Sequence, residues 1–213
     1  MKPLWSVPKI WSGDCFILGG GPSLQGMDVG RLGGSNVIAV NNAYKLAPWA
    51  GAMFFGDRRW LQLYGGGLDT FKGFKITTAP EHLDTPDIHV LRRRDRPQGI
   101  STDPTWITWN RSSGACAINL AYLFGATRII LLGFDMHAHD GRRNFHDDYP
   151  TPRRNPPYSA FLEPFPAMAK DCRRLGVQVL NATPDSSIKV WPIVHPEFIM
   201  PILPEERQQS HAQ

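Results

Sequence analysis

Long hydrophobic runs and cysteines are both scarce in this sequence of 213 residues. No apolar stretch approaches the length of a membrane-spanning helix, and the opening segment MKPLWSVPKIW lacks the apolar core of a signal peptide. The three cysteines, Cys15, Cys116 and Cys172, lie far apart in the chain, which argues against a disulfide framework and against a zinc knuckle. These absences predict a soluble, cytoplasmic protein with no membrane span.

A strong excess of charge is also absent. The formal net charge is +4 and the isoelectric point is about 9.1. These values suit a phosphate-bearing partner but fall well short of a basic nucleic-acid-binding tail. The chain is long enough to bury a core without disulfides or metals. We expect one domain over residues 1–213, with a proline-rich tail from about residue 189 that wraps the surface or meets a second subunit of a homo-oligomer.

The stretch SSGACAINLAYLFGATRIILLGFDM, residues 112–136, contains the clearest pattern in the chain. Ser112 and Ser113 provide an N-cap hydroxyl, dense apolar positions follow, and Gly125 is typical of a helix C-terminus, so a helix is expected between them. The IILL run that comes next is typical of a strand buried on both faces. Asp135 therefore lies just beyond the carboxyl end of a buried strand, where open α/β sheets bind their ligands.

Three earlier apolar runs also end in small or polar residues. Residues 15–18 lead into a glycine-rich turn, residues 37–40 into two asparagines, and residues 52–55 into a Gly-Asp pair. In a parallel sheet these ends meet at one edge. Further elements are expected as strands at 74–77, 88–91 and 177–180, a short strand allowed at 106–109, and a helix over 161–175. The predicted fold class is α/β, with a Rossmann-like, mostly parallel sheet and helices on both faces.

The glycine-rich turn GGGPS is a candidate phosphate site. Glycines allow the backbone to approach a ligand closely, and Pro22 suits the first position of a helix, so amides there can hold a phosphate. The spacing matches neither G-x-G-x-x-G nor a Walker loop, so neither dinucleotide binding nor P-loop chemistry follows from it. An ordinary tight turn is the alternative. Asn41 and Asn42 offer donors and acceptors to a base, a ribose or a phosphate, although asparagines at strand ends also form plain turns.

Residues 136–158 form a polar segment with no clear period, which we expect to be a lid-like loop. Three of the seven histidines and four acidic residues fall within residues 135–148. Histidine exchanges protons near neutral pH, and carboxylates bind hard cations. Three interpretations therefore stay open: a polar surface loop, metal-free acid–base catalysis, or a site for Mg²⁺, Mn²⁺ or Zn²⁺. The candidate metal ligands are Asp135, His137, His139 and Asp147, with His146 as an alternative.

Arginines flank these histidines. Arg142, Arg143, Arg153 and Arg154 can clamp a pyrophosphate as bidentate donors, or close over it as part of a lid. The other arginine run, at 92–94, is typical of a solvated surface.

On these motifs, the chain resembles a broad group that includes bacterial sialyltransferases of the lipooligosaccharide and polysialyl type, motility-accessory flagellin glycosylation proteins and archaeal 6-hydroxymethylpterin pyrophosphokinases. It is also similar to uncharacterised phage-encoded proteins with a histidine-rich segment after Gly-Phe-Asp-Met. The matching segments are GGGPSL at 19–24, VNN at 40–42, SSGACAINLAYLFGATRIILLGFD at 112–135 and FLEPFPAMAKDCRRLGVQVLNATPDSSI at 161–188.

The resemblance implies a transferase whose nucleotide lies across the strand ends. The residues that would bind this nucleotide are Gly19, Gly20, Gly21, Ser23, Asn41, Asn42, Asp57, Ser112, Ser113 and Gly114. Sialyltransferases of this group use tyrosines shortly after Gly-x-Asp to assist departure of the phosphate, and a later histidine as base. Here His137 and Asn144 occupy the former places, and Tyr158 lies near the latter. In this chain His137 would protonate the departing phosphate and His146 would deprotonate the acceptor, with Asp135 and Tyr158 completing the catalytic set.

Three functions remain as hypotheses. The first is a glycosyltransferase-like enzyme that moves a group from a nucleotide-sugar donor to a hydroxyl acceptor, whether a glycan, a small heterocycle or a modified nucleic acid. The second is diphosphate transfer from ATP to a small hydroxymethyl heterocycle, with Mg²⁺ or Mn²⁺ held by Asp135 or Asp57. The third is a non-catalytic phage accessory or assembly protein that retains the fold.

Overall fold

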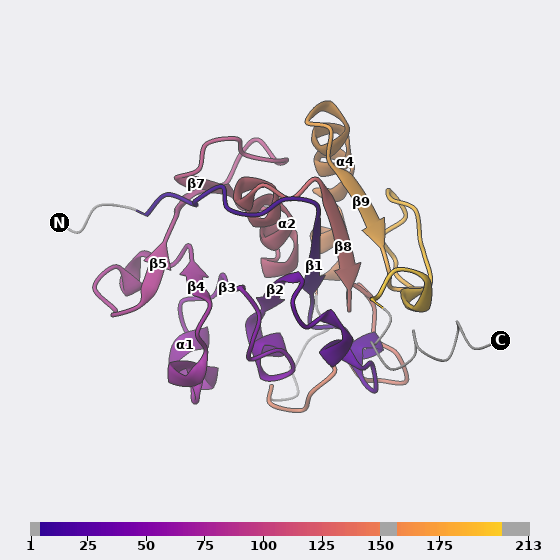
Figure 1. Ribbon diagram of the computed structural model, residues 1–213, viewed down its shortest axis with the longest axis horizontal. Helices are drawn as coiled ribbons and strands as arrows, with labels where there is room; N and C mark the ends of the chain where they lie inside the picture. Colours follow the sequence, from indigo (N-terminus) through magenta and orange to yellow (C-terminus); the bar gives the residue numbers. More distant parts are fainter. Residues whose placement is uncertain (1–4, 150–156, 202–213) are drawn as a thin grey trace.

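The computed structural model of the protein describes residues 5–149 and 157–201. At its centre, the described residues form a seven-stranded sheet in which all paired strands are parallel (Figure 1). The strands, in the order β5-β4-β3-β2-β1-β8-β9 across the sheet, are numbered along the chain as β1 (Asp14–Leu18), β2 (Asn36–Val40), β3 (Ala52–Phe55), β4 (Phe74–Thr77), β5 (Ile88–Val90), β8 (Arg128–Leu132) and β9 (Gln178–Asn181). The predicted α/β class with a parallel sheet is confirmed.

Side chains of the sheet alternate between two apolar cores, one on each face. In β1, Cys15 and Ile17 enter one core, whereas Phe16 and Leu18 enter the other, because successive residues of a strand point to opposite faces. All four are buried. A strand that is covered on both faces gives a continuous apolar run in the sequence, and this is the pattern that located the central strands.

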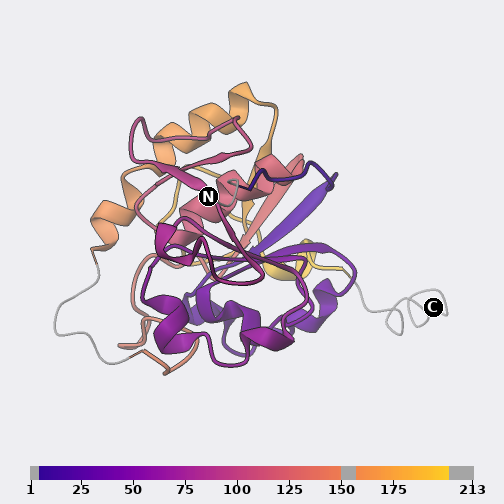
Figure 2. The same cartoon turned by 90° about the vertical axis from the view of Figure 1, so that its left-hand side faces the viewer.

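Helices cover both faces of the sheet, as predicted (Figure 2). The face of Cys15 and Ile17 packs against the two longest helices, α2 (Ser113–Phe124) and α4 (Phe165–Arg174). The opposite face is covered by shorter pieces: α1 (Trp60–Tyr64) and the 3-10 helices η1 (Pro22–Leu24), η2 (Val29–Leu32), η3 (Asn41–Lys45) and η4 (Leu68–Thr70). The remaining helices are α3 (Tyr158–Leu162), η5 (Pro80–His82) and η6 (Pro196–Phe198).

Two predicted helices differ from the observed ones. The helix expected over residues 161–175 is divided into α3 and α4 by Pro164, which has no N–H to continue a helix and whose ring conflicts with the carbonyl four residues earlier. The glycine-rich turn leads into η1, a single 3-10 turn, instead of an α-helix. After η1 the chain extends at Gln25 and turns at Gly26, whose φ is +78°.

The arginine run is a strand and not only solvated surface. β6 (Arg92–Arg94) pairs in parallel with β7 (Trp106–Thr108) as a separate two-stranded sheet. The guanidinium of Arg93 lies 5.3 Å from the ring centre of Trp109, within cation–π range. A charged run gives no strand signal in the sequence, so β6 was not predicted.

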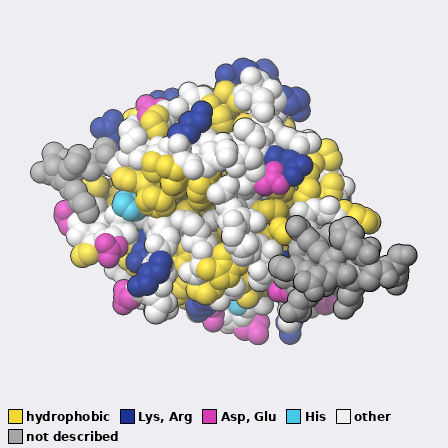
Figure 3. All heavy atoms as spheres, in the orientation of Figure 1, with side chains coloured by type: hydrophobic (Ala, Val, Ile, Leu, Met, Phe, Trp, Pro, Cys, Tyr) yellow, Lys and Arg dark blue, Asp and Glu magenta, His cyan; other side chains and the backbone are white. Residues whose placement is uncertain are grey.

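The basic side chains are spread over the surface. Figure 3 shows Lys and Arg side chains over α4, whose exposed residues include Lys170, Arg173 and Arg174. Among the described residues, no helix is long and apolar enough to cross a membrane. The chain after β9 runs back beside that strand, since the amide of Val194 donates to the carbonyl of Asn181. Residues 202–213 of the predicted tail lie outside the described part of the chain.

Candidate active site at the carboxyl ends of the strands

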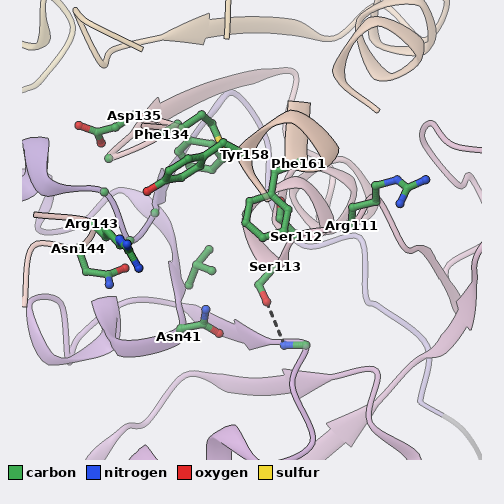
Figure 4. Close-up of a pocket in the computed structure, with 18 of the residues that line it drawn as sticks. Asn41, Arg111, Ser112, Ser113, Phe134, Asp135, Arg143, Asn144, Tyr158 and Phe161 are labelled. Carbon is green, nitrogen blue, oxygen red and sulfur yellow. Dashed lines mark hydrogen bonds between the residues drawn. The ribbon is translucent and has the colours of Figure 1, made fainter. Parts of the chain in front are cut away.

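The carboxyl ends of β1, β2, β3 and β8, together with the start of α2, surround a cavity of about 450 Å³ (Figure 4). β1 and β8 are neighbours in the sheet, but the chain first extends the sheet from β1 to β5 and only then returns to form β8. The cavity therefore lies where the strand order reverses, which is where ligands bind in open α/β sheets. Its volume is typical of small-molecule sites.

Most of the residues predicted from the sequence meet in this cavity. It is lined by the predicted Gly19, Gly20, Gly21, Asn41, Asp57, Ser112, Ser113, Gly114, Asp135, His137, Arg143 and Tyr158. Six other predicted residues, Ser23, Asn42, His139, Arg142, His146 and Asp147, are described but do not line it. Arg153 and Arg154 lie outside the described residues.

Asp135 ties the turn after β8 to the turn after β1. Its carboxylate accepts hydrogen bonds from the backbone N–H of Ser23, at 3.1 Å, and from the Ser23 hydroxyl, at 2.8 Å. The side chain is only 5% exposed, and in Figure 4 it points away from the middle of the cavity. A Cβ on Gly21 would collide with this carboxylate. Ser23, which was predicted to contact the ligand, does not line the cavity, and both its N–H and its hydroxyl donate to Asp135.

The chain after β9 braces the backbone of the β8 turn. The N–H of Phe134 donates to the hydroxyl of Thr183, at 3.0 Å, and the carbonyl of Phe134 accepts from the hydroxyl of Ser186. The carbonyl of Asp135 accepts from the N–H of Ser187, at 2.9 Å. The residues that lead from β8 into the polar loop are thus held from behind by a separate segment.

The start of α2 lines the cavity with residues whose amides precede the helix's own hydrogen bonds. The hydroxyl of Ser112 caps the helix by accepting from the N–H of Ala115, at 3.2 Å, while the hydroxyl of Ser113 accepts from the N–H of Gly56. The N–H groups of Ser113 and Gly114 come before the first intrahelical hydrogen bond, and they lie at the positive end of the helix dipole. Such an arrangement favours an anion.

The two asparagines after β2 have different roles. Asn41 lines the cavity, and its amide oxygen is buried without a hydrogen-bond partner among the described residues. Asn42 points the other way and is 1% exposed. Its amide oxygen accepts from the indole N–H of Trp60, at 2.9 Å, and from the hydroxyl of Tyr149, at 3.3 Å, while its amide N–H donates to Asp148, at 2.7 Å. Asn42, which was predicted to bind the nucleotide, does not line the cavity, and its side chain is hydrogen-bonded inside the protein.

The polar loop after β8 places only some of its predicted residues at the cavity. His137 lines it, and its Nδ1 lies 2.9 Å from the carbonyl oxygen of Asp135. Because a carbonyl can only accept, Nδ1 carries the proton and Nε2 is left as the basic nitrogen of the neutral ring. Arg143 also lines the cavity, whereas Arg142 is exposed and donates to the side chain of Gln25.

His146 lies away from the cavity, against the rings of Phe145 and Tyr149. Its Nδ1 accepts from the N–H of Asp148, at 3.2 Å, and burial lowers the pKa of its imidazole, although the Asp148 carboxylate opposes this. His146, which was predicted to deprotonate the acceptor, therefore does not line the cavity, and its ring packs on the loop itself.

The predicted metal ligands do not come together. Among residues 5–149 and 157–201, no group of three or more His, Cys, Asp or Glu side chains is arranged to hold a metal ion. The Asp135 carboxylate is engaged by Ser23, the exposed His139 lies beside Asp140, and Asp147 is exposed outside the cavity. These positions explain why the predicted set of Asp135, His137, His139 and Asp147 is not assembled.

The wall opposite the strand ends includes residues that sequence reasoning missed. Trp109, Arg111, Asn144 and Phe161 all line the cavity. Asn144 was noted only for its place in the sequence. Arg111 adopts a φ of +63° and pairs with Glu163, at 2.9 Å, which ties the start of α2 to the end of α3. A residue two positions before a predicted helix carries no sequence signal for such a role.

Tyr158 lines the cavity from the start of α3. Burial raises the pKa of its phenol, although nearby Arg143 opposes this. The hydroxyl therefore stays protonated at neutral pH and can donate a hydrogen bond. Figure 4 shows it directed toward the side of the cavity where Arg143 and Asn144 lie.

No protein-family model matches the sequence, and no curated protein matches it. Solved structures do match. The sialyltransferase CstII from Campylobacter jejuni, in complex with CMP-3FNeuAc, aligns over 90% of this chain and 89% of its own, with 14% identity and a TM-score of 0.52. The α-2,3-sialyltransferase Cst-I from Campylobacter jejuni aligns over 93% of this chain and 92% of its own, with 15% identity and a TM-score of 0.56.

A longer protein matches as well. The MAf glycosyltransferase from Magnetospirillum magneticum aligns over 99% of this chain but 39% of its own, with 14% identity and a TM-score of 0.62. This chain shares its α/β fold with these three enzymes. The predicted resemblance to sialyltransferases and flagellin glycosylation proteins is thus confirmed for the fold, while the resemblance to phage proteins and to pyrophosphokinases stays a prediction.

Proposed function

We propose that the protein is a glycosyltransferase that takes its sugar from a nucleotide donor of the CMP-sugar class. The observation that carries this proposal is the buried amide oxygen of Asn41, which has no hydrogen-bond partner among the described residues and belongs to the same cavity lining as Ser113 and Gly114 at the start of α2. An acceptor for a nucleoside hydroxyl or amino group thus lies beside donors for a phosphate. Structures of CstII with the same fold hold CMP and a CMP-sugar analogue.

The reaction would break the bond between the sugar carbon and the phosphate oxygen. The bonding electrons leave with the phosphate, where Arg143 and the α2 amides would balance the charge and the Tyr158 hydroxyl would donate a hydrogen bond. The acceptor hydroxyl oxygen forms the new bond to the sugar carbon. Its proton would pass to Nε2 of His137, whose other nitrogen donates to the carbonyl of Asp135. We therefore propose His137 as the base, in place of the acid role that the sequence suggested for it.

The two alternatives have less support. Diphosphate transfer from ATP would need carboxylates free to hold a divalent cation, but the Asp135 carboxylate is engaged by Ser23 and the Asp57 carboxylate accepts from the N–H of Arg59. A non-catalytic role would leave the unpartnered Asn41 oxygen and the cavity around it without a purpose. No described feature favours either alternative over sugar transfer.

Calorimetry and donor turnover would test the proposal. We expect CMP to bind more tightly than UDP or GDP, and a CMP-sugar to release CMP slowly when no acceptor is present. Arg143→Ala should weaken CMP binding by roughly tenfold to a hundredfold, the usual effect of losing a hydrogen bond to a charged group. Arg142→Ala is the matched control, because this neighbouring arginine lies outside the cavity. If none of these nucleotides binds, or if both variants behave alike, the proposal is wrong.

A further inference from the structure

The loop that carries Arg143 and Asn144 is attached to the protein at two places, one at the glycine-rich turn beside the cavity and one outside the cavity lining. Just after these two residues, the N–H of Phe145 donates to the carbonyl of Gly20, at 3.2 Å, within the glycine-rich turn. The loop then crosses to the β2 side of the molecule, as its path in Figure 1 shows, and meets η3.

The centre of the second attachment is the buried side chain of Asn42. Its amide N–H donates to the Asp148 carboxylate, at 2.7 Å, and its amide oxygen accepts from Tyr149. Its oxygen is fixed in this orientation by the indole N–H of Trp60 in α1, at 2.9 Å. The Asn42 side chain thus accepts two hydrogen bonds and donates one, and it is only 1% exposed. Its amide group therefore has little freedom to rotate.

The same carboxylate has a second partner on η3. The ammonium group of Lys45 lies 2.7 Å from the Asp148 oxygen that Asn42 also binds. An exposed ion pair alone contributes little to stability. Here, however, the buried amide of Asn42 already holds the Asp148 carboxylate in place for Lys45. The ring of Tyr149 packs 4.7 Å from that of Tyr64, so the end of the loop is also held by apolar contact.

We propose that Asn42 and Asp148 are positioning residues, which contact no donor but hold residues 143–149 so that Arg143 and Asn144 stay at the cavity. The inference rests on the proposed function, because it takes the cavity to bind the phosphate of a nucleotide donor. On this inference, Asn41 contacts the ligand, whereas Asn42 holds the loop.

The test compares Asp148→Ala with Asp147→Ala. Both residues are exposed neighbours on the loop, but only Asp148 is bound by Asn42 and Lys45. Without any nucleotide, Asp148→Ala should speed hydrogen exchange of residues 144–149 about fivefold or more and raise phenylglyoxal labelling of Arg143 by a similar factor. It should also weaken CMP binding about tenfold, while the midpoint of thermal unfolding falls by only about 2–4 °C, so the protein stays folded in the assay. Asp148→Glu should recover part of each effect.

Each outcome decides between the possibilities. If loop exchange and Arg143 labelling respond equally to Asp147→Ala and Asp148→Ala, the positioning role is wrong. If loop hydrogen exchange is faster in the Asp148→Ala variant but its affinity for CMP is not lower, the attachment does not affect the cavity and the inference also fails. If the unchanged protein binds no CMP, the proposed function fails by itself. The exchange and labelling measurements then still show whether Asp148 holds Arg143 in place.

Discussion

Gly20 and Gly21 are neighbours that need to be glycine for different reasons. A Cβ on Gly21 would collide with the Asp135 carboxylate, inside the protein. A Cβ on Gly20 would meet only the Asn144 side-chain oxygen, at 3.6 Å, which is an ordinary contact. Gly20 nevertheless lines the cavity, so its missing side chain leaves open space that the proposed ligand would use.

Replacing each of these glycines by alanine should separate folding from binding. We expect Gly21→Ala to lower the free energy of unfolding by about 1–3 kcal/mol, because a methyl group is forced into a packed site. Gly20→Ala should change that free energy by no more than about 0.5 kcal/mol but weaken CMP binding, because the methyl group occupies ligand space. Denaturant unfolding and calorimetry measure the two effects. Equal stability losses in both variants would contradict this assignment.

Single residues also mark the limit of prediction from sequence. The Asn-Asn pair after β2 was identified as polar and well placed, but nothing in its sequence indicates that only Asn41 faces the cavity. That difference arises because η3 begins at once, with Asn41 at a φ of +51°, which directs Asn42 toward Trp60. Arg111 was missed for a related reason, since its place at the cavity follows from a backbone turn rather than from its neighbours in the sequence.

Among the elements, the buried strands were the easiest to predict and the polar loop after β8 the hardest. Strands such as β3 and β4 were located to the residue because apolar runs report burial directly. The loop has no period, and its shape depends on hydrogen bonds to η3 and to the glycine-rich turn. Its length and lack of a period predicted a lid-like loop but could not tell which of its histidines would line the cavity.

The attachment of this loop should depend on pH through His146. Neutral His146 accepts from the N–H of Asp148, and burial holds its pKa below the ordinary value of 6.5. A histidine whose pKa is lowered by folding stabilises the folded loop fully above pH 6.5, and this contribution is lost as the pH falls through the lowered pKa. The charged groups that face the ring are Asp148, Asp147 and Lys45. Asp148 stays ionised in this range, because its hydrogen bond with Lys45 lowers its pKa.

Hydrogen exchange of residues 144–149, corrected for the intrinsic effect of pH, should therefore show less protection at pH 5.5 than at pH 7.5. His146→Asn keeps an acceptor near the same N–H but does not titrate, so its protection should vary less with pH. The same pH dependence in both proteins would show that another group is responsible.

At the scale of the whole molecule, the order of the strands creates the site. Four strand ends from distant parts of the chain reach one edge because the sheet is parallel and its order reverses between β1 and β8. The sequence predicted that these ends would meet, because alternating buried strands and helices favour that architecture. It could not predict the separate pair of β6 and β7, whose arginine run lacks the apolar pattern of a buried strand.

A ligand that binds across so many elements should stabilise the whole fold. At a concentration one hundred times its dissociation constant, CMP should add about 2.7 kcal/mol to the free energy of unfolding. For a chain of this size, that corresponds to a rise of roughly 5–10 °C in the midpoint of thermal unfolding. Differential scanning fluorimetry measures the shift, and Arg142→Ala should retain it. An unchanged midpoint under saturating CMP would contradict binding to the folded cavity.

The brace that Thr183, Ser186 and Ser187 form behind the β8 turn has a practical consequence for anyone who shortens this protein. A truncation after Asn181 would keep all seven strands of the main sheet, yet it would release the backbone that leads to His137, the proposed base. Such a fragment should look native by circular dichroism and still be inert. Shortened versions of the protein should therefore end, and fusion partners should be joined, well after Ser187.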